Sequence, residues 1–257
     1  MNIVVPVKMV PDLVEELELD ADGRALDRSF LKLRLNEFDE HAVEEAILLK
    51  EKHGGTVTVV ALDAAELDEA LFTCLAKGAD RAVKVTGVPE GGVSSHQAAR
   101  IFGEALKSIP ADLVLTGVQS AEDRDGQLGP LLAGALGAPH VSVVSGVEPS
   151  GDKAVTVRQE YAGGVMAELE VDLPAVIGVQ AAEKPPRYAP VSKVRALMKT
   201  AKLDEVACPP VEAETGAEVR RLFKPEAGGG AEMIEGSAEE VTDKLVALLS
   251  GKGLLKG

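Results

Sequence analysis

The strongest constraint on the fold is a repeated alternation of short apolar runs with segments of helical period over the first 136 residues. The apolar runs cover residues 2–9, 56–62, 82–85 and 112–116. Apolar runs this short are typical of strands that are buried on both faces of a parallel sheet. Helical periods fill residues 36–53, 63–78, 94–109 and 127–136. This order predicts an α/β fold with a doubly wound, mostly parallel sheet.

The starts of the predicted helices carry capping residues. Asn36 is expected to cap the first helix. Asp63 with Glu66, and Ser94 with Gln97, have the spacing of capping boxes, in which each side chain bonds the other's backbone N–H. These signals fix where the predicted helices begin.

The period changes to two after Val141. Residues 141–147, 153–161 and 165–171 predict antiparallel strands, and residues 175–179 predict one more buried strand. Earlier in the chain, the turn Asp20–Gly23 predicts a short hairpin outside the main sheet. The sheet is therefore expected to carry an antiparallel extension.

The compact pattern stops after Gln180. Residues 181–257 contain two Pro pairs and the run Gly228–Gly230, and one helix is indicated from Ser237 to about Ser250. We interpret residues 1–180 as an α/β nucleotide-binding domain and residues 181–257 as an extended C-terminal arm. Such an arm cannot bury its apolar residues alone, so it implies a partner surface.

Composition excludes several classes of function. A formal net charge of −15 disfavours nucleic acid and anionic membrane surfaces as partners. No apolar run is long enough to embed the chain in a membrane, and no cysteine or histidine spacing fits a metal site.

The first strand begins directly after Met1, so we expect no targeting segment and a cytoplasmic location. The usual catalytic motifs do not occur, and no catalytic residue is predicted.

Three predicted strands end in candidate ligand-binding segments. These segments start at Pro6, at Leu62 and at Gly117, and in doubly wound sheets ligands bind beyond such strand ends. Gly126 precedes a helix whose free N–H groups could hold a phosphate. A nucleotide site is therefore one hypothesis for this edge of the sheet.

Glu44 and Glu45, by contrast, are interpreted as solvated helix surface.

Several motifs, in order along nearly the whole chain, resemble those of electron-transfer flavoprotein β (small) subunits. They are Val7–Asp12, Leu35–Ala46, Gly78–Ala82, Asp112–Ser120 and Pro186–Ala189. The segments Val219–Arg221 and Met233–Gly236 resemble the tail of the bacterial members that serve methylamine-type dehydrogenases. Each motif is weak alone, but together they are specific.

The resemblance implies a Rossmann-like fold that binds AMP structurally and completes an FAD site held mainly by a larger α subunit. The residues that it places around AMP are Pro6, Asn36, Glu37, Phe38, Asp39, Leu62, Gly117, Val118, Gln119, Ser120, Ala121, Glu122, Asp123, Arg124, Asp125, Gly126, Gln127 and Leu128. It places Leu13 and Phe38 near the FAD.

The resemblance also implies partners. The chain would form a heterodimer with the α subunit, dock flavin dehydrogenases and pass electrons to an acceptor such as a quinone oxidoreductase. The docking residues that it implies are Arg187, Tyr188, Ala189 and Val191, with Val191 in the place of the usual Leu. The chain would be an electron carrier subunit without a metabolite-converting site.

Two alternatives remain open. In bifurcating members of the same family a second FAD replaces AMP, and their loop usually reads D-G-D-T where this chain has Glu122–Asp125. The carboxylates of Asp123 and Asp125 disfavour a second pyrophosphate there. An adenine-nucleotide-hydrolysing or regulatory module is the alternative from a different class. This second alternative lacks support, because modules of that class carry a phosphate-binding loop after the first strand and Lys8–Asp12 cannot form one.

Overall fold

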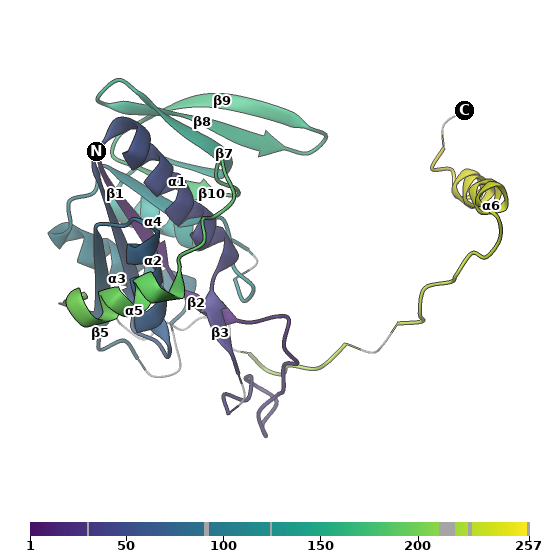
Figure 1. Cartoon of the computed structure of the whole chain (residues 1–257), viewed down its shortest axis with the longest axis horizontal. Coiled ribbons are helices and arrows are strands. Elements are labelled where there is room, and N and C mark those ends of the chain that lie inside the picture. Colours follow the sequence, from purple (N-terminus) through teal and green to yellow (C-terminus); the bar gives the residue numbers. More distant parts are fainter. Residues whose placement is uncertain (30, 90–92, 124, 211–218, 226–227, 256–257) are drawn as a thin grey trace. The chain divides into compact units, whose positions relative to one another are not determined.

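The computed structural model describes all residues except 30, 90–92, 124, 211–218, 226–227 and 256–257. The chain divides into two compact units, Met1–Val219 and Arg220–Gly257. The first unit is built on a nine-stranded sheet (Figure 1). The strands of this sheet are β1 (Asn2–Val7), β4 (Thr56–Leu62), β5 (Arg81–Thr86), β6 (Leu113–Gly117), β7 (His140–Ser150), β8 (Ala154–Tyr161), β9 (Val165–Asp172), β10 (Ala175–Val179) and β11 (Asp204–Ala207).

The strand order is β11-β5-β4-β1-β6-β10-β7-β8-β9. All pairs from β11 to β7 are parallel, whereas β8 and β9 add to β7 in antiparallel fashion. The predicted α/β fold with a mostly parallel, doubly wound sheet and an antiparallel extension is therefore confirmed. Strand β10 inserts between β6 and β7, which joins the extension to the parallel part of the sheet.

Helices cover both faces of the sheet. Helices α1 (Glu37–His53) and α2 (Leu67–Lys77) bury their apolar residues with one face, in a cluster that includes Val5, Ile47 and Leu71. Helices α3 (Ser95–Ala105) and α4 (Leu128–Leu136), with the short 3₁₀ helix η1 (Leu106–Ser108), close the other face. Burial of apolar surface in these two layers is the main source of stability.

The chain changes direction across the sheet between β1 and β6. From β1 it proceeds to β4 and β5 on one side, and later to β6 and β10 on the other. The loops that leave β1 and β6 therefore diverge at their carboxyl ends. Such a switch point leaves a crevice at that edge, which is where ligands bind in doubly wound folds.

The helix starts agree only in part with the capping signals. The capping box of Ser94 and Gln97 is confirmed. The one predicted for Asp63 and Glu66 is wrong, because Glu66 lies in the left-handed region at φ 61° and makes no side-chain cap. Asn36 stands at the start of α1, but its side chain makes no cap either, since it is drawn into a tertiary contact described below.

Four short elements were not indicated by the sequence pattern. Strands β2 (Met9–Pro11) and β3 (Leu33–Leu35) form a separate antiparallel pair, and helix α5 (Val191–Thr200) lies in the first unit. Strand β11 extends the sheet beside β5. Helix α5 buries Val194 against Phe72 of α2, and Ala189, just before the helix, joins the same cluster. The predicted hairpin near residue 20 appears as an isolated antiparallel bridge between Leu19 and Leu26.

The second unit, Arg220–Gly257, carries helix α6 (Ala238–Gly251). The helix predicted from Ser237 to about Ser250 is confirmed, and Ser237 and Glu240 form a capping box at its start. None of the α6 residues is buried, and Leu245 and Leu248 are 44% and 45% exposed. Apolar residues one turn apart on one helix face are suited to a partner surface. Among the described residues, no helix is long and apolar enough to cross a bilayer.

Candidate functional site at the carboxyl ends of the strands

Asp39 joins the ends of the two strands that flank the switch point. Its Oδ2 accepts the backbone N–H of Lys8, just after β1, at 3.0 Å, and its Oδ1 accepts the N–H of Gly117, the last residue of β6, at 3.2 Å. We call this arrangement the Asp39 bridge. The side chain comes from the first turn of α1, which the apolar face of that helix fixes on the sheet. The bridge fixes the starts of the two diverging loops relative to each other.

The electrostatics of the Asp39 bridge are set by burial. Asp39 is only 6% exposed, and burial raises the pKa of its carboxyl from 3.8 to about 7. The hydrogen bonds from Asn36, Lys8 and Gly117, together with the Lys8 charge, oppose this shift by favouring the carboxylate. Asp39 therefore titrates near neutral pH.

The backbone of α1 approaches Gly117 so closely that a side chain is excluded there. A Cβ at Gly117 would lie 2.8 Å from the Asp39 N and the Phe38 carbonyl C, and closer still to Asp39 Oδ1. Contacts below 3.0 Å with backbone atoms require the backbone to move. The glycine in this position thus allows α1 and β6 to meet at the switch point.

The loop after β6 is folded into a compact turn. Ser120 and Asp123 exchange hydrogen bonds: the Ser120 N–H donates to the Asp123 carbonyl at 3.1 Å, and the Asp123 N–H donates to Ser120 Oγ at 3.0 Å. The Asp123 carboxylate accepts the hydroxyl of Ser95, at the start of α3, at 2.7 Å. Gly126 closes the turn with φ 63° and donates its N–H to the Asp123 carbonyl. The Asp123 carboxylate is therefore directed to α3.

Two further contacts attach this loop to the other side of the crevice. The Asn36 amide donates to the carbonyl of Gln119 at 2.9 Å, and the Lys8 ammonium pairs with Glu122 at 3.2 Å. The Lys8 charge thus offsets one loop carboxylate. Arg124 lies outside the described residues.

A hollow of about 280 Å³ opens beside the Asp39 bridge. Its lining residues are Val10, Pro11, Asp12, Leu13, Val14, Arg34, Asn36, Glu37, Phe38, Gln119, Ser120 and Ala121. The predicted residues Leu13, Phe38 and Gln119 thus meet in one place although they come from three separate segments. Its chemistry is mixed, with apolar side chains beside amide, carboxylate and guanidinium groups.

The predicted nucleotide residues Asn36, Glu37, Ser120 and Ala121 also line this hollow, whereas the others do not. Pro6 and Leu62 lie near the carboxyl ends of β1 and β4, Asp39 and Gly117 lie behind the hollow in the bridge, and Val118 hydrogen-bonds Val179 of β10. The described residues from Glu122 to Leu128 form the turn and the start of α4. All of them share one edge of the sheet, as predicted from the strand order.

Two buried polar atoms lie beneath the first turn of α4. Thr116 Oγ1 and His140 Nε2 have no hydrogen-bond partner within the part of the chain that the structure describes. A Cβ at Gly129 would lie 2.8 Å from His140 Cε1 and 3.2 Å from Thr116 Oγ1, so the glycine lets the first turn of α4 pack directly on these two side chains. Burial lowers the pKa of His140, whose Nδ1 contacts the Val176 carbonyl at 2.9 Å, so the ring is neutral near pH 7. A buried hydroxyl without a partner next to free helix N–H groups is suited to a polar ligand atom.

Sequence reasoning missed several residues at this edge. Arg34 reaches the hollow because β3 pairs Arg34 with Val10 of β2, and neither strand was indicated by periodicity. Lys8 and Thr116 were also missed. The signal that could have found Lys8 and Thr116 is their position, since each lies within one residue of the carboxyl end of a strand that flanks the switch point.

Comparison with known proteins agrees with this geometry. The electron transfer flavoprotein domain family matches residues 25–212. The β subunit of an electron transfer flavoprotein from Methylophilus methylotrophus is 34% identical over 97% of this chain and 98% of its own length. The chain belongs to the electron transfer flavoprotein family. The family predicted from the sequence motifs is therefore confirmed.

Two other relatives of the family extend the match. The electron transfer flavoprotein β subunit of Syntrophomonas wolfei is 33% identical over 95% of this chain and 94% of its own length. The CarD subunit of the caffeyl-CoA reductase-Etf complex of Acetobacterium woodii is 29% identical over 99% of this chain and its full length. The similarity to these relatives thus runs through almost the whole chain.

The segment that family resemblance assigns to docking runs into α5. Tyr188 is 79% and Val191 52% exposed, whereas Ala189 is buried against α2. The guanidinium of Arg187 instead contacts Glu44 and Glu51 of α1. The structure also corrects our interpretation of Glu44 and Glu45 as solvated surface. They are 3% and 2% exposed, because Arg187 and backbone N–H groups from distant segments bind their oxygens.

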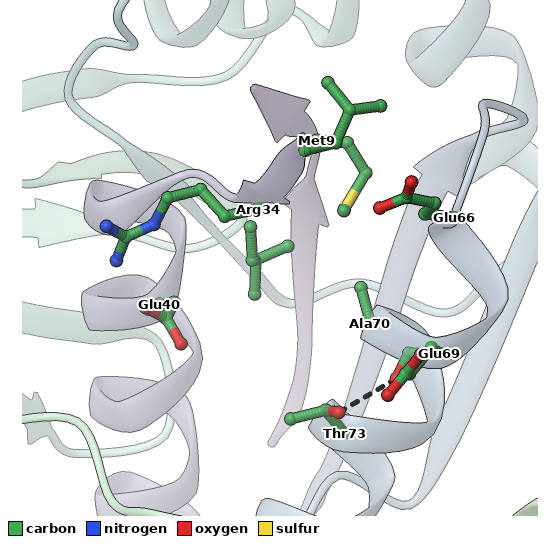
Figure 2. A pocket seen from close by; sticks show the side chains of 9 residues that line it. Met9, Arg34, Glu40, Glu66, Glu69, Ala70 and Thr73 are labelled. Carbon is green, nitrogen blue, oxygen red and sulfur yellow. Dashed lines mark hydrogen bonds between the residues drawn. The ribbon is translucent and has the colours of Figure 1, made fainter. Parts of the chain in front are cut away.

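A second hollow, of about 400 Å³, lies between the β2–β3 pair and helices α1 and α2. Figure 2 shows Arg34 and Glu40 on one side and Glu66 and Glu69 on the other, with Met9 between them. The described residues include no group of carboxylates, cysteines or histidines that could hold a metal ion. We assign no ligand to this hollow.

Proposed function

We propose that this chain is the β subunit of a heterodimeric electron carrier, which binds AMP at the switch point and completes an FAD site held mainly by an α subunit. The end-to-end similarity to a named β subunit, at 34% identity, carries the proposal. When bound, the FAD accepts electrons from a dehydrogenase and releases them to an acceptor. Residues 1–180 would serve the nucleotide, and residues 181–257 would contact partners.

The geometry supports a nucleotide at this edge. The N–H groups at the start of α4 offer a place for a phosphate. Asn36 and Gln119 hold the wall of the adjoining hollow, and its apolar residues suit a flat ring. The Asp39 bridge keeps these parts together without itself lining the hollow.

The exposed residues after β2 support a shared flavin site. Leu13 is 66% and Val14 87% exposed, and both border the hollow that Phe38 lines. Large apolar side chains in solvent at the rim of a hollow favour a partner that covers them. We propose that Leu13 and Phe38 contact the FAD that the α subunit holds.

The identity of the bound nucleotide is the most direct test. We expect one FAD and one AMP for each heterodimer, because the charges of Asp123 and Asp125 in this loop would oppose a second pyrophosphate. The measurement is denaturation of the purified heterodimer, followed by chromatographic quantification of the released nucleotides. Two FAD and no AMP would support the bifurcating alternative, whereas release of neither would contradict the proposed function.

Docking of a dehydrogenase should depend on Val191. We expect this dehydrogenase to be a bacterial enzyme of methylamine type. Because Val191 is 52% exposed at the start of α5, Val191→Ala should not destabilise the chain. Loss of its contact should weaken association by about 1–2 kcal/mol, or roughly tenfold. The measurement is the dehydrogenase concentration at half-maximal rate of flavin reduction, with the flavin spectrum as a control for the cofactor site. Unchanged kinetics with the physiological dehydrogenase would remove Val191 from the docking surface.

A further inference from the structure

The segment that leads into α5 is held along one face of α1. Nδ1 of His41 accepts the N–H of Ala182 at 3.2 Å, Glu45 accepts the N–H of Glu183 at 2.9 Å, and Glu44 accepts the N–H of Arg187 at 2.9 Å. These acceptors lie within about one turn of a single helix. They bind backbone, so they fix the path of the segment and not only one side chain.

The side chain of Arg187 completes this attachment. Its Nε and one terminal nitrogen donate to Glu44 at 3.0 and 2.9 Å, and the two terminal nitrogens donate to Glu51 at 2.6 and 3.0 Å. We call Arg187, Glu44 and Glu51 the Arg187 cluster. The two carboxylates raise the pKa of Arg187, so the guanidinium stays charged. Paired, charge-assisted bonds of this kind are geometrically specific, and lysine cannot reproduce them.

The cluster is placed directly before the exposed residues of the docking segment. Tyr188 follows Arg187, and Val191 begins α5. On the far side of these residues, α5 is attached to α2 through buried Val194 and through Lys193, whose ammonium donates to the Ala76 carbonyl at 2.6 Å. The exposed residues are therefore held between two attachment points, one on α1 and one on α2.

We infer that Arg187 is a positioning residue, which fixes the orientation of Tyr188 and Val191 by binding Glu44 and Glu51 and does not itself contact the docked dehydrogenase. Most of its N–H donors are already engaged by the two carboxylates, which leaves little for a partner. This inference rests on the proposed docking role of the segment. Helix α1 also carries Phe38 and Asp39 in its first turn, so one helix positions both the docking segment and the nucleotide edge.

The first test does not depend on electron transfer. Hydrogen exchange of the backbone amides of residues 182–189 is measured in the purified heterodimer without a dehydrogenase, for wild type, Arg187→Lys and Glu51→Gln. Glu51 is chosen because its side chain is 54% exposed, whereas loss of the buried Glu44 carboxylate would leave a charge unpaired and affect folding. Arg195→Lys, an exposed arginine on the same segment, is the control.

We expect exchange in residues 182–189 to rise roughly tenfold in Arg187→Lys, by less in Glu51→Gln, and not at all in the control, because charge-assisted bonds are lost only in the first two. Unchanged protection in Arg187→Lys would overturn the inference. Hydrogen exchange reports the attachment of residues 182–189 whether or not the chain docks a dehydrogenase. A failure of the proposed function can therefore be told apart from a failure of this inference.

The second test separates positioning from direct contact. The dehydrogenase concentration at half-maximal rate of flavin reduction should rise in both Arg187→Lys and Glu51→Gln, with the maximal rate and the flavin spectrum unchanged. If Arg187 bound the dehydrogenase directly, its release from Glu51 would instead leave docking unchanged or make it tighter. Unchanged or tighter docking by Glu51→Gln would therefore contradict the positioning role.

Discussion

Gly117→Ala should remove the bound nucleotide and lower the free energy of unfolding of the heterodimer by about 3 kcal/mol. The added methyl group would lie 2.8 Å from the backbone at Phe38 and Asp39, and none of these atoms belongs to a flexible side-chain end. Relief would require α1 and β6 to separate, which would break the Asp39 bridge to the Gly117 N–H. The measurements are the chemical denaturation midpoint at fixed protein concentration and the nucleotide released on heating.

Gly134→Ala is the matched control for this substitution. Gly134 lies within α4, and nothing lies within 4 Å of a Cβ placed there. Alanine in a helix interior should stabilise by about 0.5–1 kcal/mol relative to glycine, and nucleotide content should not change. A Gly117→Ala protein with full nucleotide content and an unchanged midpoint would show that α1 and β6 are not held as described.

Asp39→Asn should weaken nucleotide retention about tenfold at pH 8, since an unpaired buried donor costs about 1–3 kcal/mol. The carboxylate accepts N–H groups on both oxygens, from Lys8 and from Gly117. An asparagine can accept only one of them, and its own NH₂ would oppose the other. The measurement is the rate at which AMP is lost from the heterodimer, followed by its absorbance after rapid desalting.

The pH dependence of stability gives a further test of Asp39. Its pKa is raised from 3.8 to about 7, so the folded state binds the proton more tightly than the unfolded state does. The associated stability is present at acid pH and is lost as pH rises from near 4 to near 7, at up to about 1.4 kcal/mol for each pH unit. Wild type should therefore lose stability relative to Asp39→Asn across this window and change no further above it.

Nucleotide retention should show the opposite trend. Once Asp39 is protonated, its hydroxyl oxygen becomes a donor and a poorer acceptor for its backbone N–H group. AMP loss from wild type should therefore be faster at pH 6 than at pH 8, in excess of any change in Asp39→Asn. The variant corrects for titration of the AMP phosphate itself, whose second pKa lies near 6. Parallel pH profiles in the two proteins would contradict a role for the Asp39 carboxylate.

The sequence by itself determined the layers of the fold and the edge where a ligand would bind. Apolar runs such as Thr56–Leu62 coincide with their strands, and the capping boxes at Ser94 and Ser237 mark helix starts, because these features depend on neighbours within a few residues. The alternation of strand and helix then fixed the parallel sheet. The family motifs placed Phe38 and Gln119 around AMP, and Leu13 and Phe38 near the FAD; these three residues line one hollow.

Only the tertiary structure decided how distant groups satisfy one another. Glu45 is buried because it accepts the N–H groups of Val147 and Glu183, which lie 102 and 138 residues away. Asn36 does not cap its own helix because the carbonyl of Gln119 offers its amide a tertiary partner. Helix α5 was not predicted from the sequence, and it is held by the packing of Val194 on α2. Local periodicity cannot report such partners, since the cost of burying a polar group is offset by hydrogen bonds that form only when the chain is folded.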